Sequence, residues 1–506
     1  MAKKIFYLYA VIVLVFTVYI MQYDLKHLWW IAIPFLLMVV GFYDVFQKKS
    51  AILRNFPLLG HMRTILSEFG PEIRQYFVES DTNGTPFNRL QRRIIEARAN
   101  GTGGTHPFGT ELDVYQENYE WMPHSIYPVE KLAEVPRVLI GSLHCEKPYS
   151  ASILNISAMS YGSLSKNAIL ALNKGAKKGS FYHNTGEGGI APYHLEPGGD
   201  LVYQVGTGYF GCRASDGNFD PEKFRITAAP EQVRMIELKL SQGAKPGHGG
   251  ILPSKKNTEE VAKIRGIEPF TVVHSPAHHK AFSDAQGLLD FVDLLRQLSG
   301  GKPTGFKLCI GFKKEFEDIC RLMSESGQHP DFISIDGGEG GTGAAPLEFT
   351  NSVGMPLEDG LVFAVDTLKK YGLKEKIKII ASGKVATAFD IYKLLSLGAD
   401  VCSSARGMMM ALGCIQALEC DRNSCPVGVA TQEEHLMRGL VVEEKFEKVF
   451  NFHKNTLDSF LEIIAAAGIS DLKAFRRNLV FQRTNTYSSR SYEEIYPSEG
   501  EGYRRV

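Results

Sequence analysis

The sequence predicts an α/β protein: a closed (β/α)8 barrel, the TIM-barrel architecture, preceded by a transmembrane helical hairpin. Two apolar runs fill the first fifty residues, and from about residue 137 short β-branched segments ending in glycine-rich turns alternate with longer amphipathic segments. Such alternation indicates a parallel sheet, and about eight units over some 300 residues favour a closed barrel over an open doubly wound sheet. The open sheet's G-x-G-x-x-G fingerprint is not where it would be expected.

The N-terminal hairpin comes first in the chain. Ile5 to Met21 is charge-free and apolar, and Leu28 to Tyr43 is a second apolar run that contains Trp29 and Trp30. Each run is slightly shorter than the roughly 20 residues that cross a bilayer, but aromatic residues at the ends suit the membrane interface. A cleaved signal peptide is the alternative, and no small-residue cleavage site follows the first run.

Basic residues set the orientation of this hairpin. They precede the first run and follow the second, at Lys3, Lys4, Lys48, Lys49 and Arg54. The positive-inside rule therefore predicts the inner (cytoplasmic) membrane, with the catalytic domain in the cytoplasm.

Charge and cysteine content limit the kinds of partner and the cellular compartment that suit this sequence. The 506 residues hold 56 Lys and Arg against 56 Asp and Glu, so no net charge points to nucleic acid. Eight cysteines are too few for a disulfide scaffold in a chain of this length, which favours a reducing compartment.

We expect four regions: a hairpin at 1–50, a connecting subdomain at 51–130, the barrel at 131–440, and a helical extension with a loosely ordered basic tail at 441–506. Strands are expected at 138–140, 153–157, 271–273, 305–308, 332–335, 377–380 and 399–402. Helices are expected at 283–298, 360–371, 386–397 and 443–467.

The most specific motif is a cysteine triplet. Cys414, Cys420 and Cys425 have C-x5-C-x4-C spacing and are followed by Pro-Val-Gly. With no histidine among them, they favour an iron–sulfur cluster over a zinc finger, and three ligands indicate a [3Fe-4S] cluster. The alternative is three small buried side chains that happen to lie close together.

Polar loops after the strands are the expected site, because barrel enzymes work at the carboxyl ends of their strands. Met159, Ser160 and Gly162 occupy the loop Ser157-Ala-Met-Ser-Tyr-Gly-Ser163, where small residues allow a flat ring to approach. An ordinary turn with Ser165 as the helix N-cap is the alternative there. Glu187 lies in Asn184-Thr-Gly-Glu-Gly-Gly189 and is expected to point at the bound cofactor and substrate; a solvated loop carboxylate is the alternative.

A second group of loops offers cations. Gln242 and Lys245 lie in Gln242-Gly-Ala-Lys-Pro-Gly-His-Gly-Gly250, and an amide with an ammonium suits a dicarboxylate. Lys307 projects from an expected strand toward the barrel mouth, where a cation can stabilise negative charge on a bound ring; the alternative is a lysine that reaches out to solvent. His274 to His279 is read as site wall and not as a metal site.

Three further loops would hold a cofactor. Gly340 and Gly341 belong to the glycine-rich stretch 336–346, whose free amides suit an anion or a ring. Gly383 and Arg406 follow the last two expected strands, where barrels bind phosphate.

Taken together and in this order, these motifs resemble the central FMN-binding domain of glutamate synthases over roughly residues 130–440. The resemblance implies FMN beside a [3Fe-4S] cluster on Cys414, Cys420 and Cys425, and reduction of the imine of 2-oxoglutarate to L-glutamate. It implies that the Lys245 loop receives 2-oxoglutarate and that the loop holding Met159 lies along the flavin.

Departures from the family pattern leave the substrate open. Tyr209 stands where the family has arginine and His248 where it has glutamate, with Arg213 a candidate to compensate. No glutamine amidotransferase, β-helix or NAD(P)H-binding domain is expected. The nitrogen source is then ammonia, a partner glutaminase or another amine, and the electron donor is ferredoxin, a reductase subunit or a membrane carrier. Alternatives are an N-methylglutamate synthase-like enzyme using methylamine and a non-catalytic electron-transfer subunit.

Overall fold

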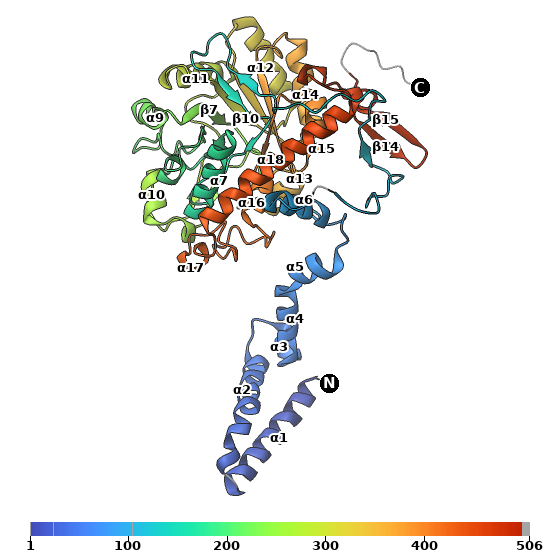
Figure 1. The fold of residues 1–506 in the computed structure, drawn as a ribbon. Coiled ribbons are helices and arrows are strands. Elements are labelled where there is room, and N and C mark those ends of the chain that lie inside the picture. Colours follow the sequence, from blue (N-terminus) through green and yellow to red (C-terminus); the bar gives the residue numbers. More distant parts are fainter. Residues whose placement is uncertain (1, 24, 104, 498–506) are drawn as a thin grey trace. The chain divides into compact units, whose positions relative to one another are not determined.

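The computed structural model describes residues 2–23, 25–103 and 105–497 (Figure 1). The chain divides into two compact units, Met1–Thr85 and Pro86–Val506. Each unit is described by itself below.

The first unit is helical. It contains α1 (Ala2–Tyr23), the 3₁₀ turn η1 (Leu25–Ile31), α2 (Ala32–Phe46), α3 (Ala51–Asn55), α4 (Leu59–Glu68), α5 (Gly70–Ile73) and the π-helical turn η2 (Arg74–Val78). Two stretches, Ala2–Gln22 and Trp29–Phe46, are long and apolar enough to cross a membrane. Gly41 faces the ring of Phe6, where a Cβ atom would lie 2.1 Å from the ring, so glycine lets α1 and α2 approach closely.

The second unit is a closed parallel barrel, which confirms the predicted fold class. Its eight strands pair in the order β4-β5-β6-β7-β10-β11-β12-β13, and β13 closes on β4. They are β4 (Leu154–Ile156), β5 (His183–Asn184), β6 (Leu201–Val205), β7 (Val233–Lys239), β10 (Thr304–Leu308), β11 (Phe332–Asp336), β12 (Lys378–Ser382) and β13 (Val401–Ser404).

Two of the expected barrel strands lie outside the barrel. β2 (Val138–Ile140) pairs antiparallel with β3 (Tyr149–Ala151), and β9 (Val273–His274) pairs with β8 (Ile251–Leu252). The barrel instead uses β5, β6 and β7, which carry inward polar residues and so lack the continuous apolar run on which the prediction relied.

Helices surround the barrel. They are α6 (Arg89–Asn100), α7 (Lys166–Gly179), α8 (Pro192–Leu195), α9 (Pro221–Ala228), α10 (Glu259–Arg265), α11 (Ala285–Leu298), α12 (Lys313–Ser326), α13 (Leu347–Ser352), α14 (Leu357–Lys370), α15 (Ala388–Ser396), α16 (Arg406–Leu412), α17 (Glu434–Met437) and α18 (Val442–Ala466). The four helices expected from the sequence correspond to α11, α14, α15 and α18. Ser165 is indeed the N-cap of α7, and its hydroxyl accepts from Ala168 N.

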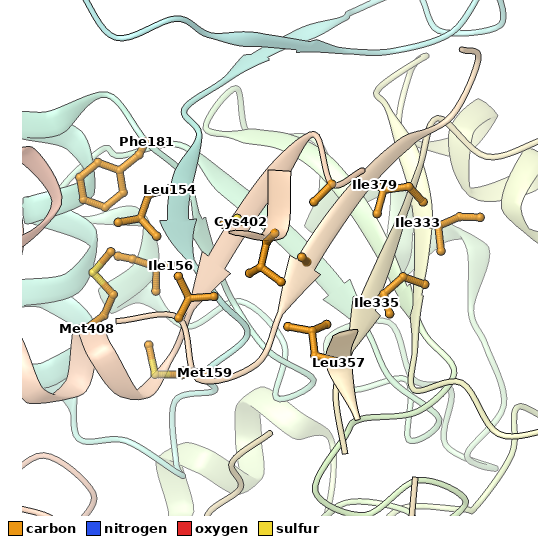
Figure 2. Close-up of a cluster of buried hydrophobic side chains, with 14 of the residues drawn as sticks. Leu154, Ile156, Met159, Phe181, Ile333, Ile335, Leu357, Ile379, Cys402 and Met408 are labelled. Carbon is orange, nitrogen blue, oxygen red and sulfur yellow. The ribbon is translucent and has the colours of Figure 1, made fainter. Parts of the chain in front are cut away.

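The core lies between the strands and these helices. Outward side chains of β4, β11 and β12 are apolar and buried, as Figure 2 shows for Leu154, Ile156, Ile333, Ile335 and Ile379. Burying each such side chain stabilises the fold by about 1.5–3 kcal/mol.

Inward side chains change character along the barrel axis. The layer nearest the amino-terminal ends of the strands is apolar and includes Tyr182, Met235 and Phe332. Ile140 and Tyr149 of the β2–β3 ribbon belong to the same cluster. The ribbon therefore closes the amino-terminal end of the barrel.

The next layer toward the carboxyl ends of the strands is polar and is centred on the buried carboxylate of Glu237. This carboxylate accepts hydrogen bonds from Asn184 Nδ2 (2.8 Å), Gln204 Nε2 (2.7 Å) and Ser334 Oγ (2.6 Å). This buried hydrogen-bond network consequently supports the carboxyl-terminal end of the barrel.

The segment after α18 is more ordered than expected. β14 (Phe481–Asn485) and β15 (Ser488–Ser491) form a sheet with β1 (Glu120–Trp121), and α19 (Tyr492–Ile495) follows. The prediction of a loose end is wrong up to residue 497, because this hairpin pairs with β1; residues 498–506 lie outside the described residues.

Candidate active site

Charged side chains meet at the carboxyl ends of three strands. Lys239 ends β7, Asp336 ends β11, and Lys307 lies on β10 between them; all three are less than a tenth exposed. Lys307 Nζ lies 3.4 Å from Asp336 Oδ2, which also accepts from Gly243 N at 2.8 Å. Burial opposes the charged form of Lys307, yet Asp336 and Glu237 raise its pKa. The raised pKa keeps Lys307 in its charged form beside Asp336.

Glu187 and Gln242 are held together by Lys239. Lys239 Nζ lies 2.9 Å from Glu187 Oε2 and donates to Gln242 Oε1 at 2.6 Å. Burial opposes ionisation of Glu187, but Lys239, Lys245 and Arg265 together lower its pKa. Glu187 is consequently an ionised carboxylate surrounded by cations.

Lys245 is almost completely buried. Its ammonium donates to the carbonyl of Ala344 at 2.6 Å, in the glycine-rich loop after β11. Burial lowers the pKa of Lys245 to about 8, with Glu187 opposing the fall and Lys239 adding to it. The loops that carry Lys245 and Gly340 thus meet at one site.

Arg265 belongs to the same group and was not predicted. It ends α10 and is buried, and its Nη2 lies 3.1 Å from the carbonyl of Tyr161 and 3.5 Å from Ser160 Oγ. Its guanidinium stacks 5.1 Å above the ring of Phe210, and among the described residues its Nε has no hydrogen-bond partner. Burial lowers the pKa of Arg265 to about 10.

The loop after β4 is packed against the loop after β5. Met159 N donates to Asn184 O at 3.3 Å, and a Cβ atom on Gly186 would lie 2.7 Å from Ser160 N. Gly162 has φ +96° and accepts a hydrogen bond from Gln432 Nε2. Glycine is therefore required for these two loops to form one wall.

A second wall is built around Arg406. Its Nη2 donates to Glu339 O at 2.6 Å, and a Cβ atom on Gly341 would lie 2.7 Å from Arg406 Nε. Gly340 N closes a turn on Gly337 O at 2.8 Å.

Lys384, directly after Gly383, lies next to Arg406. Burial and the charge of Arg406 both lower the pKa of Lys384, whose backbone is left-handed at φ +50°. Two neighbouring cations of this kind favour an anion between them.

The three predicted cluster cysteines lie on one loop between α16 and α17. All are free thiols; Cys425 is buried, and Cys414 and Cys420 are half-buried. Burial raises the pKa of Cys414 to about 11, and the nearby Cys420 and Cys425 add to the rise. Within residues 2–497 as described, no three His, Cys, Asp or Glu side chains are arranged to hold a metal ion.

The backbone of this thiol loop is unusual. Gln416, Leu418 and Asn423 all have φ near +60°, a left-handed conformation that non-glycine residues seldom adopt. Gln416 is pinned by Phe87, whose N donates to Gln416 Oε1 at 3.1 Å and whose carbonyl accepts from Gln416 Nε2 at 3.3 Å. Folding therefore fixes a costly loop shape.

A buried lysine lies beside the thiols. Lys256 Nζ donates to Cys420 O at 2.9 Å and to Ser163 O at 2.6 Å. Burial lowers the pKa of Lys256 to about 8, while Cys420 and Cys425 oppose the fall. One cation consequently joins the thiol loop to the loop after β4.

Tyr209 and His248, the two residues that depart from the family pattern, pack against other groups of the protein. Tyr209 is fully buried, its hydroxyl accepts from Ala281 N at 3.1 Å, and its ring contacts Phe219. Arg213 donates to Gly208 O at 3.1 Å, and His248 meets the ring of Phe349.

Sequence reasoning missed Lys239, Lys256 and Arg265. Lys239 would have been found had Val233–Lys239 been recognised as a strand, because its last residue faces the barrel mouth. Arg265 and Lys256 lie outside any glycine-rich motif, and only the fold brings them to the site.

The sequence is similar to those of known proteins. A family model described as a conserved region in glutamate synthase matches residues 125–470. The glutamate synthase large subunit-like protein YerD of Bacillus subtilis is 37% identical over 495 residues, which cover 90% of this chain and 94% of YerD.

More distant relatives match over the barrel. The archaeal glutamate synthase (NADPH) of Methanocaldococcus jannaschii is 34% identical over 328 residues, covering 64% of this chain and 60% of that protein. The glutamate synthase (NADPH) large chain of Azospirillum brasilense is 31% identical over 320 residues, 20% of its own length. This chain belongs to the FMN-binding glutamate synthase family, a family of oxidoreductases.

Proposed function

We propose that this protein is a glutamate synthase-type flavin oxidoreductase that reduces the imine of 2-oxoglutarate to L-glutamate. The observation that carries the proposal is the buried charge group at the barrel mouth, in which Lys239, Lys245 and Arg265 surround Glu187. Three cations around one carboxylate leave an excess of positive charge, which suits a dicarboxylate.

Each carboxylate of the substrate has a binding group in this proposal. Arg265 has an Nε–H without a hydrogen-bond partner among the described residues, and this group would donate to one substrate carboxylate. Lys245 would release the Ala344 carbonyl and donate to the substrate instead. Gln242, oriented by Lys239, supplies an amide donor. Glu187 lies within this group and would hold or release a proton at the imine nitrogen.

The residues present fit FMN. Met159, Ser160 and Gly162 would line the ring, Lys307 would offset negative charge on it, and Gly340, Gly341, Gly383 and Arg406 would hold its phosphate end. FMN bound there supplies hydride to the imine carbon.

The thiol loop carries three thiols, the ligand type of an iron–sulfur cluster, and the Lys256 ammonium lies beside it. Cys414, Cys420 and Cys425 would hold a [3Fe-4S] cluster, the group through which electrons from an outside donor reach the flavin. The donor is a ferredoxin, a reductase subunit or a membrane carrier.

The test is an anaerobic reaction of the pre-reduced protein. Addition of 2-oxoglutarate with ammonium should restore the oxidised flavin spectrum and form glutamate, whereas either compound alone should not. If neither ammonium nor methylamine with 2-oxoglutarate reoxidises the flavin, the synthase proposal fails and an electron-transfer subunit is left. N-methylglutamate as the product would select the methylamine reaction.

Membrane anchoring is part of the proposal. The two apolar helices of the first unit support insertion into the inner membrane, and the basic residues at Lys3, Lys4, Lys48 and Lys49 support a cytoplasmic catalytic unit. The region limits at 1–50, 51–130, 131–440 and 441–506 stay a prediction.

A further inference from the structure

Residues 51–78 expose far more apolar surface than a segment in water needs. Within α3, α4, α5 and η2 only Gly60 is buried among the described residues. The exposed large apolar side chains are Ile52, Phe56, Leu59, Met62, Ile65, Leu66, Phe69, Ile73, Tyr76, Phe77 and Val78. Contiguous apolar surface on this scale marks an interaction site.

The apolar side chains of α4 lie on one side of the helix. Leu59, Met62 and Leu66 recur at helical spacing, and Phe69 continues the series at the C-cap. Together with Ile65 they lie within about 120° of the helix circumference at 100° per residue, with Thr64 on the opposite side and Glu68 outside this arc. This is the pattern of a helix that lies in a membrane interface.

Charge and position favour the same partner. Residues 47–78 contain five cations (Lys48, Lys49, Arg54, Arg63 and Arg74) against two carboxylates. A basic segment next to a membrane span is attracted to the anionic lipids of the cytoplasmic leaflet. Only four residues, 47–50, separate the end of α2 from α3. Pro71 interrupts the apolar stripe after Phe69, which disfavours a continuous coiled coil with a second copy.

We propose that residues 51–78 lie in the headgroup region of an anionic bilayer, with Leu59, Met62, Leu66 and Phe69 against the acyl chains. The inference rests on the proposed anchoring by residues 2–46. It adds a second, interfacial mode of membrane contact to the two spans.

The test places a diazirine amino acid singly at Met62, Thr64 or Val15 of the full chain, reconstituted in vesicles that contain anionic phosphatidylglycerol. Thr64 is the matched control on the polar side of α4, and Val15 is the control within α1, where it is exposed. After irradiation, mass spectrometry should find lipid adducts at Val15 and Met62, and severalfold fewer at Thr64. In neutral vesicles the yield at Met62 should fall severalfold while that at Val15 is unchanged.

Other results separate the two proposals. Lipid adducts at Val15 but not at Met62 would overturn the interfacial contact and leave the anchoring intact, and adducts at neither position would overturn both. Crosslinks from Met62 to a second chain or to the barrel would overturn the lipid contact and identify that protein surface as the partner of α4. Equal yields at Met62 and Thr64 would show that α4 has no membrane-facing side.

Discussion

The cations at the barrel mouth are buried, and burial affects how strongly each of them would bind an anion. Lys239, Lys245, Lys307 and Arg265 are all buried, and Asp336 and Glu237 outweigh burial to raise the pKa of Lys307. Lys245 and Arg265 have lowered pKa values because burial disfavours their charge. An anionic ligand would relieve that cost, so these two side chains should respond most strongly to substrate.

Replacing Lys245 tests this directly. Lys245→Gln should weaken 2-oxoglutarate binding about 10- to 100-fold, because a hydrogen bond to a charged group contributes about 1.5–3 kcal/mol. Equilibrium titration of the flavin absorbance measures the dissociation constant. The exposed Lys255→Gln is the control and should bind normally; the same loss in both variants would contradict the assignment.

The pH dependence of binding follows from the same side chain. The Lys245 ammonium, with a pKa of about 8, is charged below pH 8 and neutral above it. Affinity for 2-oxoglutarate should therefore be full below that pH and fall by up to tenfold per pH unit above it. Lys245→Arg should remove the fall between pH 8 and 9, and an unchanged profile in that variant would assign the titration to another group.

Lys256 should set the reduction potential of the proposed cluster. Removing its charge in Lys256→Met disfavours the added electron, so the potential should become more negative by about 60 mV, a tenfold change in a one-electron equilibrium. A redox titration followed by electron paramagnetic resonance measures this. Lys256→Arg should restore the potential, and a potential unaffected by Lys256→Met would limit the lysine to holding the loop.

At the scale of elements, one lysine of α15 links α14 to β1, the strand that pairs with the C-terminal hairpin. Lys393 of α15 lies 2.8 Å from Glu120 of β1 and 2.6 Å from Glu358 of α14, and the Tyr492 hydroxyl of α19 lies within hydrogen-bond distance of both carboxylates and donates to one of them. Burial opposes the charged form of Lys393, but Glu358 and Glu120 raise its pKa. Four elements far apart in sequence thus share one network.

Lys393→Met should lower the free energy of unfolding by about 3–5 kcal/mol, since it leaves two carboxylates together without a cation. Urea denaturation followed by circular dichroism measures the change. The exposed Lys473→Met should shift stability by less than about 0.5 kcal/mol. Equal stability of the two variants would show that the network adds nothing.

Elements differ in how well the sequence predicts them. β10 to β13 contain short apolar or β-branched stretches and were expected within one or two residues, whereas β5 to β7 carry inward Asn184, Gln204 and Glu237 and were not. Local pattern could not tell that these polar residues face a closed interior where they satisfy one another. Glycine-rich motifs located Glu187, Gln242 and Lys245, but Arg265 reaches the site only because α10 packs beside the loop after β4.

At the scale of the molecule, an apolar helical unit precedes an enzyme unit. The full protein should sediment with membranes and resist alkaline carbonate extraction, because the two proposed spans would bury many apolar side chains in lipid. Replacing Leu14 and Leu36, both exposed in the helices, with arginine should release it, since each charge costs about 2.5–3.5 kcal/mol at a helix centre. Release of the unaltered protein by carbonate would contradict the anchoring.

The left-handed residues of the thiol loop bear on how the protein matures. Gln416, Leu418 and Asn423 have left-handed backbones, and two hydrogen bonds with Phe87 brace the first of them. Contacts within the polypeptide thus bear part of the cost of ordering that loop. That contribution would lower the share of the cost left for iron and sulfide to meet when the proposed cluster assembles.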